Sequence, residues 1–115
     1  MNQEQINELR QLAQAATPGP WRAAISSSMV NSVCTTFETV CETGKNIDDA
    51  LYIAAANPAA VLELIRQRDE LMEALKDARE MVSDWAGYAS PYFQEKHDID
   101  GDLKKLDDAI ARMEG

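Results

Sequence analysis

Three aspartates separated by single residues stand in the C-terminal quarter of the sequence, at Asp98, Asp100 and Asp102. Alternating carboxylates are typical of calcium loops, in which a glycine occupies the sixth position and a glutamate the twelfth. Here Gly101 is the fourth residue of the series and Ala109 is the twelfth. The spacing does not support an EF-hand, so we interpret the three aspartates as an acidic, solvated turn of a helix.

The other residues able to do chemistry are few and scattered. His97 is the only histidine, and no serine or cysteine nucleophile stands in a recognisable relation to it. Cys34 and Cys41, with that single histidine, do not make a zinc ligand set. A glycine-rich phosphate loop and a nucleophile elbow are both missing from the sequence. We therefore expect a protein that is not an enzyme and that uses no metal or other cofactor, with both cysteines as reduced, buried thiols.

The charge distribution indicates which partners the protein would repel. The net charge is −9; residues 1–45 carry four acids and three bases, whereas residues 46–115 carry sixteen acids and eight bases. Such a surface repels nucleic acid and anionic membranes but suits a basic protein partner, although solubility alone would also explain it. The longest apolar run is too short to span a membrane and the first residues do not resemble a secretory signal. The expected location is the cytoplasm.

One long periodic segment, 57–85, must position any interaction surface. Asn57 followed by Pro58 is typical of a helix start, because the asparagine caps a backbone N–H and proline fits the first helical position. A seam of eight residues at alternating spacings of three and four predicts a two-helix contact, with Ile65 and Met72 widening it. The seam residues are Val61, Leu64, Arg68, Leu71, Leu75, Ala78, Val82 and Trp85.

A second seam predicts a partner helix over residues 91–114. It consists of Tyr92, Lys96, Ile99, Leu103, Leu106, Ile110 and Met113. Two helices of similar length joined by a short connection should pack antiparallel. This pairing predicts Leu75 opposite Leu103, and Arg68 opposite Ile110 with its guanidinium near Asp107 or Asp108. Leu71→Asp or Leu106→Asp is then expected to unfold the hairpin.

The preceding residues predict a small mixed head. Asn2 and Gln5 form a capping-box pattern at the start of a short helix, and two prolines and a glycine in 17–20 end that helix. Residues 21–25, 29–34 and 37–42 read as three strands of an antiparallel meander, in which Phe37, Thr39 and Cys41 share one face. Asn46 can cap a further short helix. The predicted class is α+β: a head over residues 1–57 followed by an antiparallel helical hairpin over residues 58–115.

Aromatic residues gather where the two long helices are predicted to meet, at Trp85, Tyr88, Tyr92 and Phe93. Exposed aromatic side chains are enriched in protein contacts, although local packing would also account for them. Together with Asp98, Asp100 and Asp102, these aromatics are the candidate partner-binding residues.

Three stretches together resemble a known family. Residues 9–21 read LRQLAQAATPGPW, residues 40–43 read VCET, and residues 49–61 read DALYIAAANPAAV. In this order they resemble the Ead family of early accessory proteins from lambdoid phages and prophages, whose middle region leads into a coiled-coil tail. The resemblance extends from residue 9 to about residue 75.

The resemblance implies a small, non-catalytic phage protein with no catalytic residues to carry over. Our first hypothesis is therefore an accessory protein that binds and modulates a host protein, during host takeover or against a defence system. One alternative is an acidic mimic of nucleic acid that blocks a host enzyme. Another is a structural module that self-associates, as a dimer, through the apolar residues Ile65 and Met72.

Overall fold

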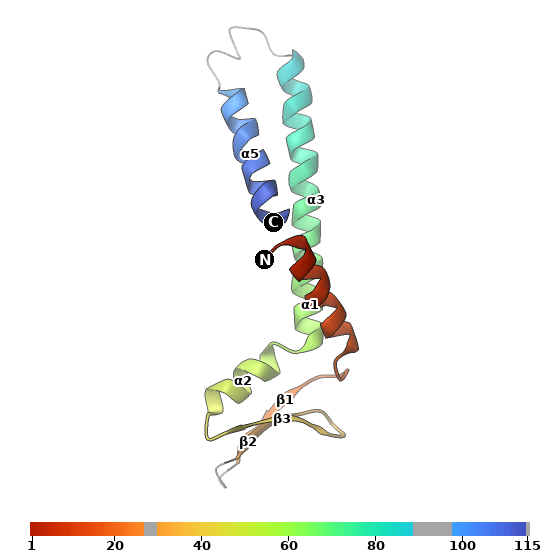
Figure 1. Ribbon diagram of the computed structural model, residues 1–115, viewed down its shortest axis with the longest axis vertical. Coiled ribbons are helices and arrows are strands. Elements are labelled where there is room, and N and C mark those ends of the chain that lie inside the picture. Colours follow the sequence, from red (N-terminus) through yellow and green to blue (C-terminus); the bar gives the residue numbers. More distant parts are fainter. Residues whose placement is uncertain (27–29, 89–97, 115) are drawn as a thin grey trace. The chain divides into compact units, whose positions relative to one another are not determined.

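The computed structural model describes residues 1–26, 30–88 and 98–114, and it confirms the α+β class (Figure 1). The chain divides into two compact units, one formed by residues 8–65 and one by residues 1–7 with 66–115. In chain order the elements are α1 (Gln3–Ala15), β1 (Arg22–Ala24), β2 (Asn31–Cys34), β3 (Thr39–Gly44), α2 (Ile47–Ala55), α3 (Pro58–Tyr88) and α5 (Ile99–Glu114).

The predicted meander is present in the unit of residues 8–65. Its three strands lie in the order β1-β2-β3, and both neighbouring pairs are antiparallel. Helix α2 packs across the sheet, where Val33, Ala50 and Ala54 form the buried core. Trp21 packs against this core and its indole N–H donates to the carbonyl of Thr17, 3.0 Å away. A sheet this small depends on the covering helix for its stability.

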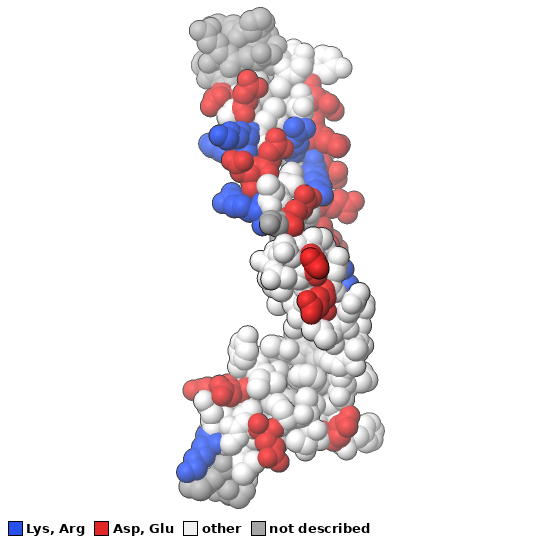
Figure 2. All heavy atoms as spheres, viewed as in Figure 1, with Lys and Arg blue, Asp and Glu red and all other residues white. Residues whose placement is uncertain are grey.

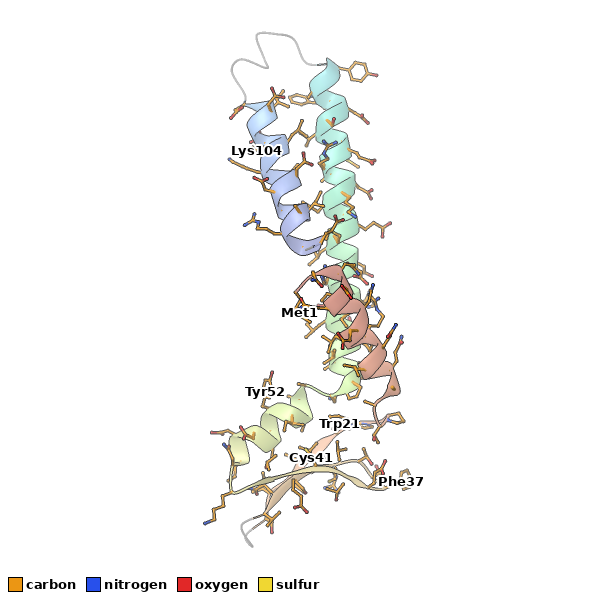
Figure 3. The ribbon with its side chains drawn as sticks, viewed as in Figure 1. Met1, Trp21, Phe37, Cys41, Tyr52 and Lys104 are labelled. Carbon is orange, nitrogen blue, oxygen red and sulfur yellow. The ribbon has the colours of Figure 1, made fainter. Side chains whose placement is uncertain are left out.

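The predicted limits and faces of the third strand are wrong. Strand β3 begins at Thr39 rather than at Phe37, whose side chain projects from the end of the sheet and is almost fully exposed (Figure 3). Val33 pairs with Cys41 and Cys34 with Thr39, so Val40 is an extra residue on β3. This bulge interrupts the alternation of faces, which is why both Val40 and Cys41 pack against the core.

The predicted starts of α1, α2 and α3 are confirmed by their hydrogen bonds. The Gln5 N–H donates to Asn2 Oδ1 over 2.8 Å, and the Asn2 N–H donates to Gln5 Oε1 over 2.9 Å, which completes the capping box. Asn46 Oδ1 accepts from the N–H of Asp49 at the start of α2. Asn57 Oδ1 accepts from the N–H of Ala60 at the start of α3.

In the other unit, α5 lies antiparallel beside α3, as Figure 1 shows. The prediction of one continuous helix over 91–114 is wrong at Asp98, which is a turn residue directly before the start of α5 at Ile99. Asp98 Oδ1 accepts from the N–H of Gly101 over 3.0 Å, so Asp98 caps the helix from outside it. A side chain that caps a helix competes with continuation of the helix through the same residue. The predicted part at 91–97 lies outside the described residues.

The buried face of α5 matches its predicted seam, but the buried face of α3 is displaced by one position. Ile65 and Met72, which were expected only to widen the seam, are buried, whereas Leu64 and Leu71 are two-thirds exposed. Trp85 is half exposed. The face turned toward α5 therefore includes Met72, Leu75, Arg79, Val82 and Ala86 rather than Leu71, Ala78 and Trp85.

The predicted register between the two helices is also wrong. Arg79 lies opposite Asp107, and Ser83 lines the same small cavity as Leu103. Leu103 was expected opposite Leu75 of α3. Relative to that prediction, α5 is displaced along α3 by about eight residues, or roughly 12 Å at 1.5 Å per residue. The ion pairs of Arg79 with Asp107 and of Lys76 with Glu114 stabilise this displaced register.

Candidate interaction surfaces

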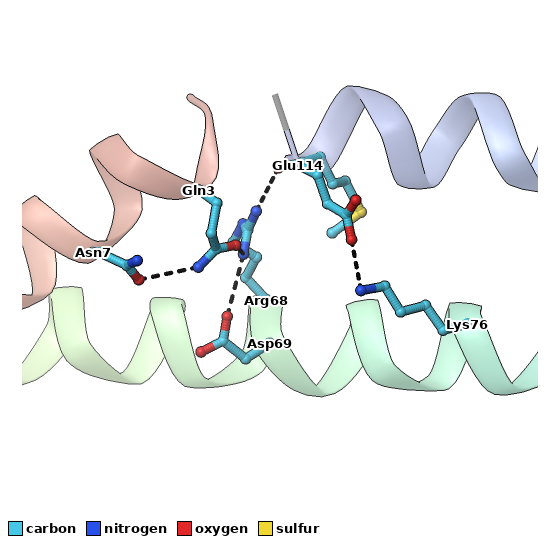
Figure 4. A network of polar contacts seen from close by, with 7 residues as sticks. Gln3, Asn7, Arg68, Asp69, Lys76 and Glu114 are labelled. Atoms are coloured by element: carbon cyan, nitrogen blue, oxygen red, sulfur yellow. Dashed lines mark hydrogen bonds and ion pairs between the residues drawn. The ribbon is translucent and has the colours of Figure 1, made fainter.

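Arg68 joins three helices within the unit of residues 1–7 and 66–115 (Figure 4). Its guanidinium donates to Gln3 Oε1 of α1, 3.3 Å away, to Asp69 Oδ1, 3.2 Å away, and to the carbonyl of Met113 near the end of α5. An arginine at a helix C-terminus satisfies a carbonyl that has no partner within the helix. Arg68 was expected to reach Asp107 or Asp108, and the displaced register explains why it reaches Met113 instead.

Two ion pairs hold α3 to α5 above this junction. Arg79 Nε lies 2.8 Å from Asp107 Oδ1, and Lys76 Nζ lies 2.6 Å from Glu114 Oε1. The hydrogen bond with Asp107, and then its charge, raise the pKa of Arg79, so this guanidinium keeps its proton at every working pH. Lys76 and Arg79 are the only bases of α3 beyond Arg68. Both are therefore engaged with the neighbouring helix.

A row of carboxylates occupies a different face of α3. Acidic side chains gather along the edge of the unit in Figure 2 that lies away from α5. All five members of this acidic row are exposed and follow one another at spacings of three and four, which places them on one helix face. The acidic row consists of Glu70, Glu73, Asp77, Glu80 and Asp84.

An exposed apolar stripe runs beside the acidic row. Its side chains are Leu71, 67% exposed, Met81, 70% exposed, and Tyr88, 90% exposed, with the half-exposed Trp85 and two small residues, Ala74 and Ala78. These six residues also recur at spacings of three and four. The first five of them each follow a member of the acidic row directly in sequence, so α3 carries three faces: buried, apolar and acidic.

The described residues include only part of the expected aromatic and acidic patch. Trp85 and Tyr88 are exposed on the last turns of α3, and Tyr92 and Phe93 lie outside the described residues. Asp98, Asp100 and Asp102 are exposed at the first turn of α5, where carboxylates interact favourably with the helix dipole. Their role in partner binding stays a prediction. The sequence did not predict the exposed stripe, because Leu71 was placed in the seam between the two long helices and Met81 was given no role.

A concave surface lies in the unit of residues 8–65. A groove of about 660 Å³ separates the end of α1 from the start of α3, and most of its lining is apolar. Gly19 has a φ of 103°, a conformation that favours glycine, and it turns the chain along one wall. The lining residues are Ala13, Gln14, Ala16, Pro18, Gly19, Pro20, Asn57, Pro58, Ala59 and Leu62. Residues 18–20, which the sequence explains as the end of a helix, and Asn57 with Pro58, which it explains as the start of another, therefore line the same groove.

Reactive groups are not assembled in the part of the chain that the structure describes. Cys34 and Cys41 are free thiols and half-buried in the sheet. Within the described ranges, histidine, cysteine and carboxylate side chains do not gather in threes as a metal site requires. Among the same residues, no helix is both long enough and apolar enough to cross a membrane.

These features define a small α+β protein whose prominent surfaces are suited to contact with other molecules: an apolar groove in one unit and, in the other, a helical hairpin with an acidic and an apolar face. The chain belongs to the Ead/Ea22-like protein family of phages, whose family model matches residues 4–115. Comparisons with curated proteins and with solved structures found no match. The match extends the resemblance beyond residue 75 to the end of the hairpin.

Proposed function

We propose that this protein is a non-catalytic phage accessory protein that binds a host protein in the cytoplasm and modulates it, during host takeover or against a defence system. Membership of the Ead/Ea22-like family supplies the phage context. The observation that carries the binding role is the apolar stripe of α3. Leu71, Met81 and Tyr88 are each at least two-thirds exposed along one face of a regular helix.

Exposing a continuous row of large apolar side chains to water is unfavourable in free energy unless another molecule covers them. Scattered exposed leucines are ordinary, but contiguous apolar patches mark contact sites on folded proteins. Aromatic residues and methionine are enriched at such contacts, and the stripe contains Met81, Trp85 and Tyr88. Protein binding is therefore the role that this surface supports best.

The proposal is tested by affinity capture of the full-length chain from its bacterial host, with an unrelated protein of equal net charge as the control bait. We expect a host protein that is enriched over the control and whose activity changes when the purified chain is added. Capture that never exceeds the control, at several expression levels and at physiological salt, would reject the proposal.

The acidic row favours nucleic-acid mimicry as the second candidate function. From Glu70 to Asp84 it extends over roughly 21 Å of helix, at 1.5 Å per residue. Carboxylates in a row can occupy a groove that normally binds phosphates. Such binding depends mainly on charge, so it should be lost in high salt, and a DNA fragment should compete for the target. A target whose binding persists in high salt and resists DNA competition would exclude mimicry.

Ile65 and Met72 do not offer an exposed surface for self-association. Both side chains are buried within the single chain, at 5% and 7% exposure. A dimer would have to use another face.

A further inference from the structure

We propose that the apolar stripe of α3, Leu71 to Tyr88, is the docking site for an amphipathic helix of the partner protein that carries a row of lysines or arginines along one flank. The proposal rests on the proposed function, because it names the surface and the chemistry of the partner that the protein would bind. It depends on three features of α3: the position of the stripe, the charges beside it, and the small residues at its centre.

The position of the stripe leaves it open beside the packed hairpin. At 3.6 residues per turn, the centre of the stripe lies roughly 115° from the face of α3 that covers α5 and roughly 90° from the acidic row. A helix resting on the stripe would therefore touch the acidic row on one side. From Leu71 to Tyr88 the stripe is about 26 Å long, which is enough for about five turns of a partner helix. Side chains at three- and four-residue spacings are how an apolar helix face is recognised.

The charge on α3 specifies a basic flank on the partner. Lys76 and Arg79, the two bases among residues 70–88, form ion pairs with Glu114 and Asp107 of α5. Their charges are thus directed to the buried side of the helix, and the acidic row extends along the other side of the stripe from Glu70 to Asp84. Positive side chains on the partner would complement this row, whereas acidic ones would be repelled.

The centre of the stripe specifies the shape of the partner. Ala74 and Ala78 are exposed one turn apart, with Leu71 on one side and Met81, Trp85 on the other. Small residues between larger ones make a shallow saddle, and helix packing places a large side chain into such a gap. We therefore expect the partner helix to present a leucine or phenylalanine at its centre, and smaller residues where it crosses Met81 and Trp85.

A second copy of this chain fits the stripe poorly. In an antiparallel pair that shares the stripe, the two acidic rows would face each other along their whole length, and like charges oppose contact. In a parallel pair, each acidic row would meet the side of the partner helix that α5 already covers, near Leu75 and Val82. The single acidic flank therefore selects a partner of opposite charge.

The test uses the full-length protein and two synthetic helical peptides of eighteen residues. Both peptides carry leucines at three- and four-residue spacings; one has lysines along one flank and the other has glutamates at the same positions. Binding is followed by fluorescence anisotropy of the labelled peptide. We expect the basic peptide to bind with a Kd of about 10 µM, in the range of small transient interfaces, and the acidic peptide not to bind.

Variants separate docking on the stripe from general attraction to an acidic protein. Met81→Glu and Leu71→Glu should each weaken the basic peptide about tenfold, as loss of an interface anchor does. Leu51→Glu is the matched control: Leu51 is half exposed on α2, in the other unit, and the substitution adds the same charge. Circular dichroism should show unchanged helicity for all three. Equal binding by Leu71→Glu and Leu51→Glu would overturn the proposal.

A second pair of variants tests the role of the acidic row. Asp77→Asn with Glu80→Gln should weaken the basic peptide about threefold at low salt and reduce the dependence of binding on salt. Glu38→Gln with Glu42→Gln removes the same number of exposed carboxylates from the unit of residues 8–65 and should leave binding unchanged. Equal losses from the two pairs would mean that the row is not part of the site.

The same variants distinguish failure of this inference from failure of the proposed function. If a host protein is captured equally by the wild-type chain and by Leu71→Glu, the host-binding role stands and the stripe is not the docking site. If a host protein is never captured, the proposed function fails regardless of the peptide result. A dimer in light scattering that Leu71→Glu abolishes would assign the stripe to a second copy and overturn the inference.

Discussion

Two neighbouring residues of α3, Leu71 and Met72, give a direct test of how the hairpin is held together. The apolar pattern of the sequence predicts Leu71 at the helix contact, whereas the structure buries Met72 and leaves Leu71 two-thirds exposed. Replacing each residue by alanine removes a side chain of similar size from the same turn of the same helix. We expect Met72→Ala to destabilise the hairpin and Leu71→Ala to have little effect.

The expected difference follows from the exposed fractions. Met72, at 7% exposure, loses nearly all of its burial, and methionine-to-alanine changes in cores cost about 2–5 kcal/mol. The lower half of that range applies, because a two-helix contact can relax more readily than a deep core. Leu71 is only one-third buried, so it can lose about 0.5–1 kcal/mol of a full burial worth about 1.5–3 kcal/mol. The better helix propensity of alanine offsets part of this loss.

Urea denaturation followed by circular dichroism at 222 nm measures both variants against the wild type. The slope of each transition has to match the wild type, because a changed slope indicates that the native or denatured state has changed. Leu71→Asp should also leave the hairpin folded, in contrast to what the sequence pattern alone predicts. A Leu71→Ala loss equal to or larger than that of Met72→Ala would refute the face of α3 described above.

Two further predictions test the register and the start of α5. Arg79→Asp and Asp107→Arg should each lower the urea midpoint, and the double variant should recover part of the loss because the charges are paired again; independent, additive effects would contradict the register. Gly87→Ala should stabilise α3 by about 0.5–1 kcal/mol, since nothing lies near the added methyl group. Gly101→Ala should bring no such gain, because its Cβ would lie 2.1 Å from Asp98 Oδ2 and displace the cap; equal melting-temperature increases for both would contradict this account.

Local signals in the sequence predicted the local structure well. Each helix start rests on a side chain that bonds to the backbone three residues away, as Asn46 does to Asp49 and Asn57 does to Ala60. Such bonds need only neighbouring residues, so their pattern is visible in the sequence. The three strands were likewise predicted from local residue patterns. The extra residue at Val40 depends on the pairing of β3 with β2, so it has no local signal in the sequence.

The faces of α3 could not be predicted because the sequence contains two overlapping seams. One passes through Leu71 and Ala78 and the other through Met72 and Arg79, and both share Leu75 and Val82. Apolar content favours the first seam, since arginine weakens the second. In the structure Arg79 stabilises the contact between α3 and α5, because it pairs with Asp107 of α5. Counting apolar positions does not reveal this ion pair, because the pair depends on the register between α3 and α5.

The existence of two seams on one helix has a consequence for function. A helix needs one apolar face to pack against its neighbour, and a second face of similar quality adds cost in water without adding to the fold. In α3 the seam with the larger side chains, Leu71 and Trp85, is the more exposed one, and the seam with Arg79 is covered. The better apolar surface is thus left outside the folded chain. Burial of that surface on association, rather than on folding, is what makes α3 suited to bind a partner.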